Sequence, residues 1–397
     1  MTRAHRAAIA AFILATGSAA HAAAQATPFV FGADLSYANQ MDDCGAVFRD
    51  GGAPKDVFRI FADHGHTLVR VRLWVDPAWQ RTLVQPPGVP LVYGDLDDVR
   101  RTIRRAKGAG MQVLLDMHYS DIWADPQRQA VPARWRAVAR DTPALADSVH
   151  AYTAAVLRAL AADGLLPDMV QVGNEINPGI LVHGRLDPRF EGRDTIPGGW
   201  ARQAALLNAG IRAVREAGRG AARPPKVMLH FAAIDTLVTD FRHAIEAGVT
   251  DFDVMGFSYY YAWHGGSLAK MAGVVRALRA RWPRYEVMAV EAGYAWTTAN
   301  HDAMPNIIGI ADPQYTPLSP AMQLRYLVDY AVAVHDAGGI GVVLWEPAWV
   351  STPCRTPWGR GSAHDHVAFF TPDGLDYMAD GGGAWAERAR GWVGGGR

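Results

Sequence analysis

The chain has 397 residues, with 39 Lys and Arg against 39 Asp and Glu, so its formal net charge is zero. This balance, without any run of like charge, gives no support for nucleic-acid binding. Half of the residues are hydrophobic and 20% are charged, which excludes a disordered or fibrous chain and predicts a globular protein. Trp, Tyr and Phe number 13 each, although Trp is normally the scarcest, and sugar rings are one class of ligand that stacks on such flat faces.

The N-terminal segment has the pattern of a secretory signal peptide. Arg3 and Arg6 precede an apolar stretch at 7–15, and small residues then lead to an Ala-x-Ala site that ends near Ala24. A short buried helix is the alternative, but the stretch ends in a low-complexity segment. We therefore expect residues 1–24 to be removed on export, and 25–397 to be one domain in the periplasm or outside the cell. No later segment is apolar and long enough to span a membrane, so no membrane association is expected.

Short apolar or β-branched runs alternate along the chain with longer amphipathic stretches. Eight runs predict strands at 29–35, 68–74, 111–117, 169–173, 226–231, 252–258, 286–291 and 340–345. Helices predicted between them include 55–64, 97–108, 143–163, 200–216, 268–281 and 321–337. Eight strand-then-helix units predict an α/β protein with a single (β/α)8 TIM barrel. A doubly wound open sheet is the alternative, but no G-x-G-x-x-G follows the first run.

Two glutamates directly follow the fourth and seventh predicted strands. In such a barrel the chemistry lies at the carboxyl ends of the strands, and these two strands lie across the barrel mouth from each other. Glu175 and Glu291 can therefore converge on one cleft. Two carboxylates on opposite sides of a glycosidic bond supply the proton and the nucleophile or base that its cleavage needs. Either glutamate alone is equally consistent with a structural ion pair, whereas the pair, with Asn174 adjacent, favours catalysis.

The sequence resembles family 53 of the glycoside hydrolases, the endo-β-1,4-galactanases of clan A, from about residue 31 to about residue 375. The stretches that carry the resemblance include RVRLWVDP from Arg70, HYSDIWADP from His118, VQVGNEINPG from Val170, GFSYYYAWHG from Gly256, VMAVEAGYAWT from Val287 and LWEPAWV from Leu344. The NE pair alone indicates only the clan, whereas the first two stretches point to the family. The resemblance implies a retaining enzyme, without a cofactor, that cleaves internal β-1,4-galactosidic bonds in the galactan side chains of type I arabinogalactan and pectin.

The resemblance also assigns roles to individual residues. Glu175 matches the acid/base and Glu291 the nucleophile of the family. Asn174 is suited to holding the 2-hydroxyl of the reacting sugar. Arg72 is expected near Glu291, where its charge keeps that carboxylate ionised, or in a salt bridge inside the barrel. Trp345 is expected to form a stacking platform under the reacting sugar.

The other expected substrate-binding residues are less distinctive. They are His118, Asp121, His230 and Tyr260, with Trp263 and Trp349 as weaker candidates. For the two histidines, a hydrogen-bonded position in the core is the alternative. Asp121 either holds a sugar hydroxyl or braces its own loop, and loop tryptophans often only pack.

One part of the family pattern is altered here. Some bacterial members bind calcium through a loop after the seventh strand, and the matching positions are Asn300, Asp302, Met304 and Asn306. A thioether at Met304 is a poor calcium ligand, and Asp302 is the one charged ligand left. No Cys or His cluster has zinc spacing in the sequence. We therefore predict no metal site.

Two other interpretations of the whole chain stay open. One is a different clan-A activity, such as a mannanase or glucanase, because sugar identity depends on hydroxyl contacts that the sequence does not resolve. The other is a carbohydrate-binding barrel without catalysis, which would normally have lost both carboxylates. For the galactanase we expect a monomer that acts on polysaccharide.

The two cysteines lie 310 positions apart, after the first and the eighth predicted strand. In a closed barrel these strands are neighbours, so Cys44 and Cys354 belong to adjacent loops on one face. Their Cα atoms can then approach the roughly 4.4–6.8 Å that a disulfide needs, and export would permit oxidation. Two buried free thiols are the alternative. We expect the disulfide, with a larger effect on stability than on catalysis.

Overall fold

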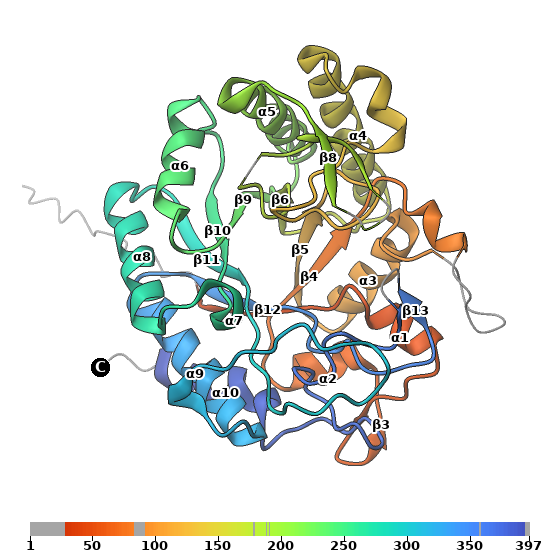
Figure 1. Ribbon diagram of the computed structural model, residues 1–397, viewed down its shortest axis with the longest axis vertical. Coiled ribbons are helices and arrows are strands. Elements are labelled where there is room, and N and C mark those ends of the chain that lie inside the picture. The colour runs from red at the N-terminus through yellow and green to blue at the C-terminus, as the bar shows by residue number, and fades with distance from the viewer. Residues whose placement is uncertain are drawn as a thin grey trace, which may run out of the picture.

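Eight parallel strands close into a barrel, which confirms the predicted (β/α)8 fold (Figure 1). The computed structural model describes residues 28–82, 92–177, 179–187, 189, 191–356 and 359–393, so the predicted signal peptide lies outside this part of the chain. The barrel strands are β1 (Val30–Asp34), β4 (Leu68–Leu73), β5 (Gln112–Met117), β6 (Met169–Val172), β9 (Lys226–Ala232), β10 (Val254–Ser258), β11 (Glu286–Glu291) and β12 (Gly341–Leu344). Each predicted strand agrees with one of these to within two residues at either end.

Helices surround the barrel, as Figure 1 shows. They are α1 (Ala38–Asp43), α2 (Val57–Asp63), α3 (Leu96–Gly108), α4 (Thr142–Ala162), α5 (Gly199–Ala217), α6 (Leu237–Glu246), α7 (Tyr261–His264), α8 (Leu268–Arg281), α9 (Pro320–Asp336) and α10 (Trp385–Val393). The six predicted helices correspond to α2, α3, α4, α5, α8 and α9. We had not predicted α6, although its Leu237, Phe241 and Ala244 are spaced to form one buried face.

Side-chain caps explain where several helices begin. The carboxylate of Asp95 accepts a hydrogen bond from the amide of Asp98 at the start of α3. The hydroxyl of Ser319 accepts one from the amide of Met322 at the start of α9. Such caps satisfy amides of the first turn that have no partner within the helix, and they fix the direction in which each helix leaves its loop.

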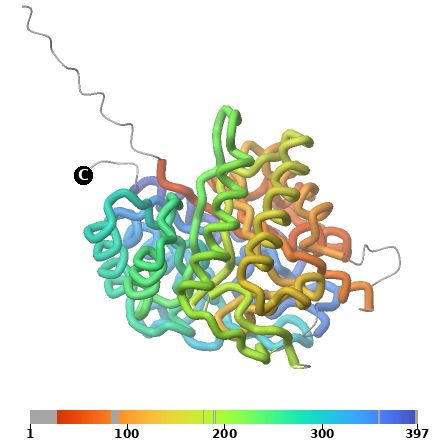
Figure 2. Tube along the Cα trace, turned by 90° about the horizontal axis from the view of Figure 1, so that it is seen from above, coloured from red at the N-terminus to blue at the C-terminus, as the bar shows by residue number. Residues whose placement is uncertain are grey.

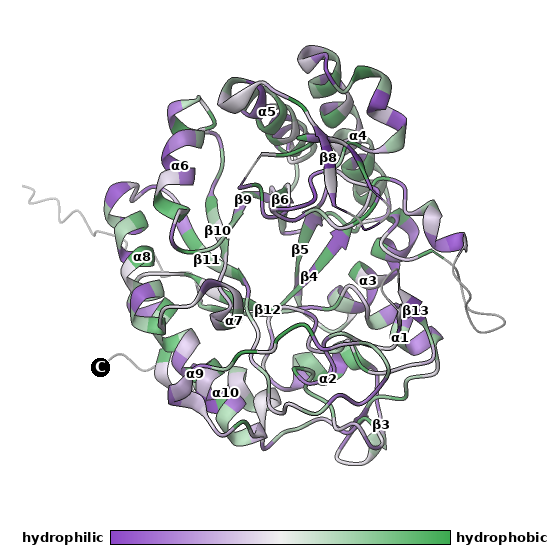
Figure 3. Cartoon of the chain, in the orientation of Figure 1, coloured by the Kyte–Doolittle hydropathy of each residue, from purple (hydrophilic) through white to green (hydrophobic). Residues whose placement is uncertain are grey.

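The barrel strands are buried on both faces, as their near-continuous apolar sequences require. In β4, the side chains of Val69, Val71 and Leu73 belong to the large core between the barrel and the helices. Leu68, on the opposite face, belongs to a smaller apolar cluster to which all eight strands contribute. Figure 3 shows how far green, apolar segments extend along the strands, while purple is common on the outer helices.

The pairing of β10 with β11 is irregular at the end that carries Glu291. Phe257 lies opposite Ala289, but the next residue, Ser258, lies opposite Glu291 instead of Val290. A shift of this kind turns the following side chains to the other face of the strand. It allows Glu291 to face the mouth of the barrel although it differs in parity from the inward-facing Met288.

The first and last units of the barrel are joined covalently. Cys44 and Cys354 form a disulfide with their Cα atoms 5.7 Å apart, as predicted. Figure 2 shows the red start of the chain beside its blue end, in agreement with the pairing of β1 and β12. The two-stranded sheets are β2 (Arg49–Asp50) with β3 (Ala53–Pro54), β7 (His183–Leu186) with β8 (Gly192–Thr195), and β13 (Arg355–Thr356) with β14 (Gly359–Arg360). No described helix is long and apolar enough to cross a membrane.

Candidate active site

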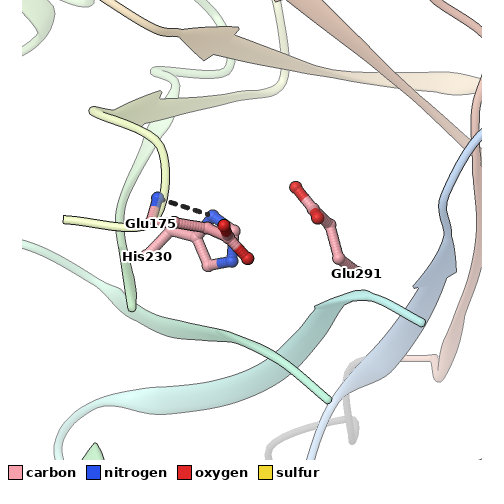
Figure 4. Close-up of side chains that lie close together, drawn as sticks. All are labelled: Glu175, His230 and Glu291. Carbon is pink, nitrogen blue, oxygen red and sulfur yellow. Dashed lines mark hydrogen bonds between the residues drawn. The ribbon is translucent and has the colours of Figure 1, made fainter. Parts of the chain in front are cut away.

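Glu175 and Glu291 face each other across the mouth of the barrel (Figure 4). Glu291 ends β11, and Glu175 follows β6 by three residues. An oxygen of each carboxylate lies within 4.8 Å of the other. Carboxyl groups about 5–5.5 Å apart are typical of retaining glycosidases, whereas inverting enzymes hold them about 6.5–9.5 Å apart. The separation therefore suits a nucleophile and an acid/base acting on one sugar.

The arginine that contacts Glu291 is Arg70. Its guanidinium lies 2.8 Å from a carboxylate oxygen of Glu291 and also 2.8 Å from oxygens of Asp34 and Asp116. It donates a further hydrogen bond of 2.6 Å to Oδ1 of Asn174. Arg70 is 1% exposed, so its charge acts in a medium with little water to screen it. One buried cation thus holds three carboxylates and the candidate sugar-binding amide in place.

Arg72, which we expect near Glu291, has another carboxylate as its ion-pair partner. Arg72 pairs with Glu346, which follows β12, at 2.5 Å. Its guanidinium lies over the ring of Tyr37 at 4.3 Å. Both arginines of β4 point into the barrel, but Arg72 stands one pleat nearer the mouth and meets a different carboxylate. The other role that we expect for Arg72, a salt bridge inside the barrel, is confirmed.

The surroundings shift the pKa values of the two facing glutamates in a useful direction. Burial, and after it the negative charge of Glu291, raise the pKa of Glu175 well above its ordinary value of 4.5. Burial raises the pKa of Glu291 to about 7, and Arg70 opposes this rise. Two close carboxylates cannot both ionise easily, so one keeps a proton while the other is charged. Arg70 contacts Glu291 directly, so Glu291 is the better candidate for the ionised member of the pair.

The two histidines expected to bind substrate are held on both ring nitrogens by the protein. His118 contacts Asp116 at 2.9 Å through Nε2 and accepts a hydrogen bond from the amide of Ala124 through Nδ1. His230 is fully buried; Nε2 lies 2.8 Å from the hydroxyl of Ser258, and Nδ1 accepts from the amide of Glu175 (Figure 4). Both therefore have the contacts of the alternative, a hydrogen-bonded histidine in the barrel, and His230 lies directly beside Glu175.

The remaining expected residues lie in different settings. The hydroxyl of Tyr260 donates to Oε2 of Glu291 at 3.4 Å. Trp345 is partly exposed and packs against the small apolar cluster that contains Tyr260. Asn174 is 4% exposed and close to Glu175 in sequence and space. Asp121 accepts from the amide of Ala133 at 2.8 Å, which is the contact of a loop brace.

The family model described as "Glycosyl hydrolase family 53" matches residues 30–377 of this chain. The chain belongs to this family. An arabinogalactan endo-beta-1,4-galactanase of Cellvibrio japonicus is 44% identical over 349 residues, which is 87% of each chain. An endo-beta-1,4-galactanase of Bacillus subtilis is 30% identical over 364 residues, covering 87% of this chain and 78% of the relative.

Solved structures of family 53 have the same architecture. The catalytic domain of the Ignisphaera aggregans enzyme superimposes with a TM-score of 0.78 at 29% identity, over 91% of this chain and 96% of that one. A fungal beta-1,4-galactanase superimposes with a TM-score of 0.73 at 25% identity, over 91% and 99% of the two chains. The sequence comparison and the structural comparison therefore agree on the barrel and on the family.

Sequence reasoning missed several members of this family 53 site. Arg70, Gln171 and Ser258 were not singled out, although each lies in an apolar strand and has the same parity as an inward-facing residue of that strand. Polar residues at alternate positions of a strand that is buried on both faces are the signal that would have found them. Three carboxylates that pair with the arginines of β4 also belong to the site: Asp34, Asp116 and Glu346.

Metal binding is poorly supported by the described residues. In the described part of the chain, one group of possible ligands has its atoms within 4.8 Å of one another: Glu175, His230 and Glu291. Both nitrogens of His230 are engaged by protein groups, so this histidine does not fit a ligand role. At the altered calcium loop, Oδ2 of Asp302 accepts from Ser351 and from the amide of Ser362, and Oδ1 accepts from the amide of Met304. The absence of a metal requirement stays a prediction.

Proposed function

We propose that this protein is a retaining endo-β-1,4-galactanase that cleaves internal bonds of the β-1,4-galactan in type I arabinogalactan and pectin. Membership of family 53 and the names of its relatives in Cellvibrio japonicus and Bacillus subtilis support the substrate. The single observation that carries the mechanism is the distance within 4.8 Å between carboxylate oxygens of Glu175 and Glu291. It leaves no room for the water that an inverting enzyme places between its carboxylates and the sugar.

The proposed reaction has two displacements. In the first, an oxygen of Glu291 bonds to the anomeric carbon while the bond to the leaving oxygen breaks, and Glu175 gives its proton to that oxygen. In the second, Glu175 takes a proton from water, the water oxygen bonds to the anomeric carbon, and the carboxylate of Glu291 leaves. Two inversions restore the β-configuration. Arg70 stabilises the charged form of Glu291 that begins and ends each cycle.

The proposed sugar contacts divide into direct and supporting ones. Asn174 is placed beside Glu175 to hold the 2-hydroxyl, and the partly exposed Trp345 offers a stacking face. Tyr260 steadies Glu291 through its hydroxyl. The other expected substrate-binding residues, Arg72, His118, Asp121 and His230, support the site through the protein contacts described above.

A reducing-end assay tests the substrate. The enzyme should release reducing ends from potato galactan, and little from mannan or carboxymethyl cellulose. Proton NMR should show the β-anomer as the first product. Equal activity on mannan would favour another clan-A glycanase, and a first-formed α-anomer would contradict two displacements.

Variants test the two carboxylates separately. Glu291→Ala should lower galactan cleavage at least about 10⁴-fold and abolish covalent labelling by a 2-fluoro-galactoside. Glu175→Ala should retain most activity on aryl glycosides with good leaving groups, which need no proton. Glu286→Gln is a matched control, because this glutamate lies at the other end of β11, where it pairs with Lys226. Equal losses for Glu175→Ala on both substrate types would contradict the acid/base assignment.

We further propose that the protein acts after export. The charged, apolar and small-residue segments of residues 1–24 support cleavage near Ala24. N-terminal sequencing of the enzyme from the periplasm and the medium tests this. An enzyme that stays in the cytoplasm with residues 1–24 attached would contradict it.

A further inference from the structure

Ser258 ends β10 with its hydroxyl between Glu175 and His230. The side chain is fully buried. Its Oγ donates to Oε1 of Glu175 at 2.6 Å and lies 2.8 Å from Nε2 of His230. On the other side of the ring, the amide of Glu175 donates to Nδ1 at 3.4 Å. The chain of three hydrogen bonds therefore begins and ends on the same residue.

The donors and acceptors in this chain have one consistent direction. A backbone amide only donates, so Nδ1 of His230 accepts, and a neutral imidazole then carries its hydrogen on Nε2. Nε2 donates to Ser258, whose single hydrogen is left for Oε1 of Glu175. Oδ1 of Asn174 also lies 3.0 Å from Nδ1, but it already accepts from Arg70 at 2.6 Å. Burial, and after it Arg70, hold the pKa of His230 well below its ordinary value, in agreement with a neutral ring.

We propose that Ser258 is a positioning residue that reserves Oε1 of Glu175 as a hydrogen-bond acceptor and so places the transferable proton on Oε2. A neutral carboxyl group has one carbonyl oxygen and one hydroxyl oxygen, and only the carbonyl oxygen accepts well. With Ser258 donating to Oε1, the proton occupies the other oxygen. The inference rests on the proposed acid/base role of Glu175 and goes beyond it, because it names the oxygen that gives and takes the proton.

The backbone at Glu175 shows why such support is needed. Glu175 has φ of 45°, in the left-handed region that a residue with a side chain adopts only at a cost in free energy. The amide contact to His230 and the carboxylate contact to Ser258 hold the residue at both ends in this conformation. The register shift between β10 and β11 brings Ser258 opposite Glu291, next to both carboxylates.

The hydroxyl also acts on the ionisation of Glu175. Three charged groups from other elements face this carboxylate: Glu291 from β11, Asp125 from the loop after β5, and Arg70 from β4. Burial and the two acids raise the pKa of Glu175, whereas Ser258 and Arg70 lower it. Removing the hydroxyl should therefore raise this pKa further, because the ionised form loses a donor.

The test compares Ser258→Ala with the wild type on galactan and on aryl β-1,4-galactobiosides of graded leaving-group pKa. We expect kcat/KM on galactan to fall about 10- to 100-fold, as for loss of a hydrogen bond to a charged group. On the dinitrophenyl glycoside the fall should be less than about threefold, since its leaving group needs no proton. The alkaline limb of the kcat/KM profile, where Glu175 loses its proton, should move to higher pH.

Ser120→Ala is the matched control. Ser120 is a buried serine in the loop after β5, and among the described residues its hydroxyl has no hydrogen-bond partner. This variant should leave the leaving-group dependence and the alkaline limb unchanged. Equal losses on both substrates, an unmoved alkaline limb, or the same changes in Ser120→Ala would overturn the proposal for Ser258.

A second variant tests the same proposal in case Ser258→Ala does not fold. Ser258→Cys has a similar shape and a weaker donor, so it should shift both readouts in the same direction by less. An unchanged profile in a folded Ser258→Cys enzyme would count against the proposal. If the wild type itself does not cleave galactan, the proposed function fails. If the wild type is active and only these shifts are missing, the positioning role alone fails.

Discussion

The inside of the barrel has two layers that the same eight strands build. One layer is apolar and lies mostly near the amino ends of the strands, with Val290 of β11 nearer the carboxyl end; its members are Val30, Leu68, Leu114, Met169, Met228, Val254, Met288, Val290 and Val343. Nearer the carboxyl ends the inward positions are polar, and they include Asp34, Arg70, Asp116, Gln171, His230 and Ser258. Both layers are buried to almost the same degree.

The two layers differ in what burial does to them. In the apolar layer, each fully buried side chain contributes about 1.5–3 kcal/mol to folding. In the polar layer, each charge loses its hydration, and contacts such as those of Arg70 offset that cost only while every partner is present. The apolar layer therefore stabilises the barrel, whereas the polar layer costs part of that stability and shifts the pKa values of the two glutamates at the mouth.

The largest effect is expected from Arg70→Met. It leaves Asp34, Asp116 and Glu291 without this counter-charge, so stability should fall by about 3–5 kcal/mol and kcat/KM by about 10²–10³-fold. The pKa of Glu291 should rise further, which moves the acid limb of the kcat/KM profile to higher pH. Arg72→Met should also destabilise the protein, because it breaks the pair with Glu346, but should leave the acid limb in place. An acid limb that moves in Arg72→Met and stays in place in Arg70→Met would contradict the conclusion that Arg70, and not Arg72, acts on Glu291.

Leu114→Ala probes the apolar layer. Leu114 is fully buried, so the truncation should cost about 2–5 kcal/mol in the free energy of unfolding, measured by urea denaturation. Activity per folded molecule should stay within about threefold of the wild type, because the polar contacts above it are intact. A large change in the pH profile of this variant would show that the layers are not independent.

The disulfide ties the first and last units at the mouth, outside both layers. The double variant Cys44→Ser with Cys354→Ser should lose about 2–4 kcal/mol of stability, because the bond closes a loop of 310 residues. Its kcat/KM below the melting temperature should be nearly unchanged. Thiol titration of the unreduced, denatured protein provides an independent check, and two free thiols would refute the bond.

The smallest effect, Glu175→Gln, has the opposite sign. The folded-state pKa of Glu175 lies well above 4.5, so the folded protein binds this proton more tightly than the unfolded chain does. The protonated form of Glu175 therefore contributes its full share of the free energy of unfolding below pH 4.5. This contribution is lost as the pH rises through the folded-state pKa. Removing the titrating group should therefore stabilise the protein at pH 7 and change little at pH 4. If Glu175→Gln were less stable than the wild type at pH 7, the conclusion that ionising the buried Glu175 costs stability would be wrong.

The sequence by itself determined the barrel and the two glutamates. Apolar runs and amphipathic stretches are local properties, so their alternation predicts strands and helices without knowledge of their neighbours. Glu175 and Glu291 were found because each follows a strand, and the topology of a closed barrel carries such positions to one face. The same closure brought Cys44 and Cys354 together in prediction and in the structure.

Which polar groups meet depends on contacts between segments that are far apart in the chain. Arg70 and Arg72 have the same parity in one strand, and the stagger between distant strands selects Arg70 for Glu291. Glu291 faces the mouth because the register of β10 and β11 slips by one residue, which no local pattern in either strand reveals. Periodicity specifies the face on which a side chain lies, whereas its height in the barrel and its partners depend on packing between segments far apart in the chain.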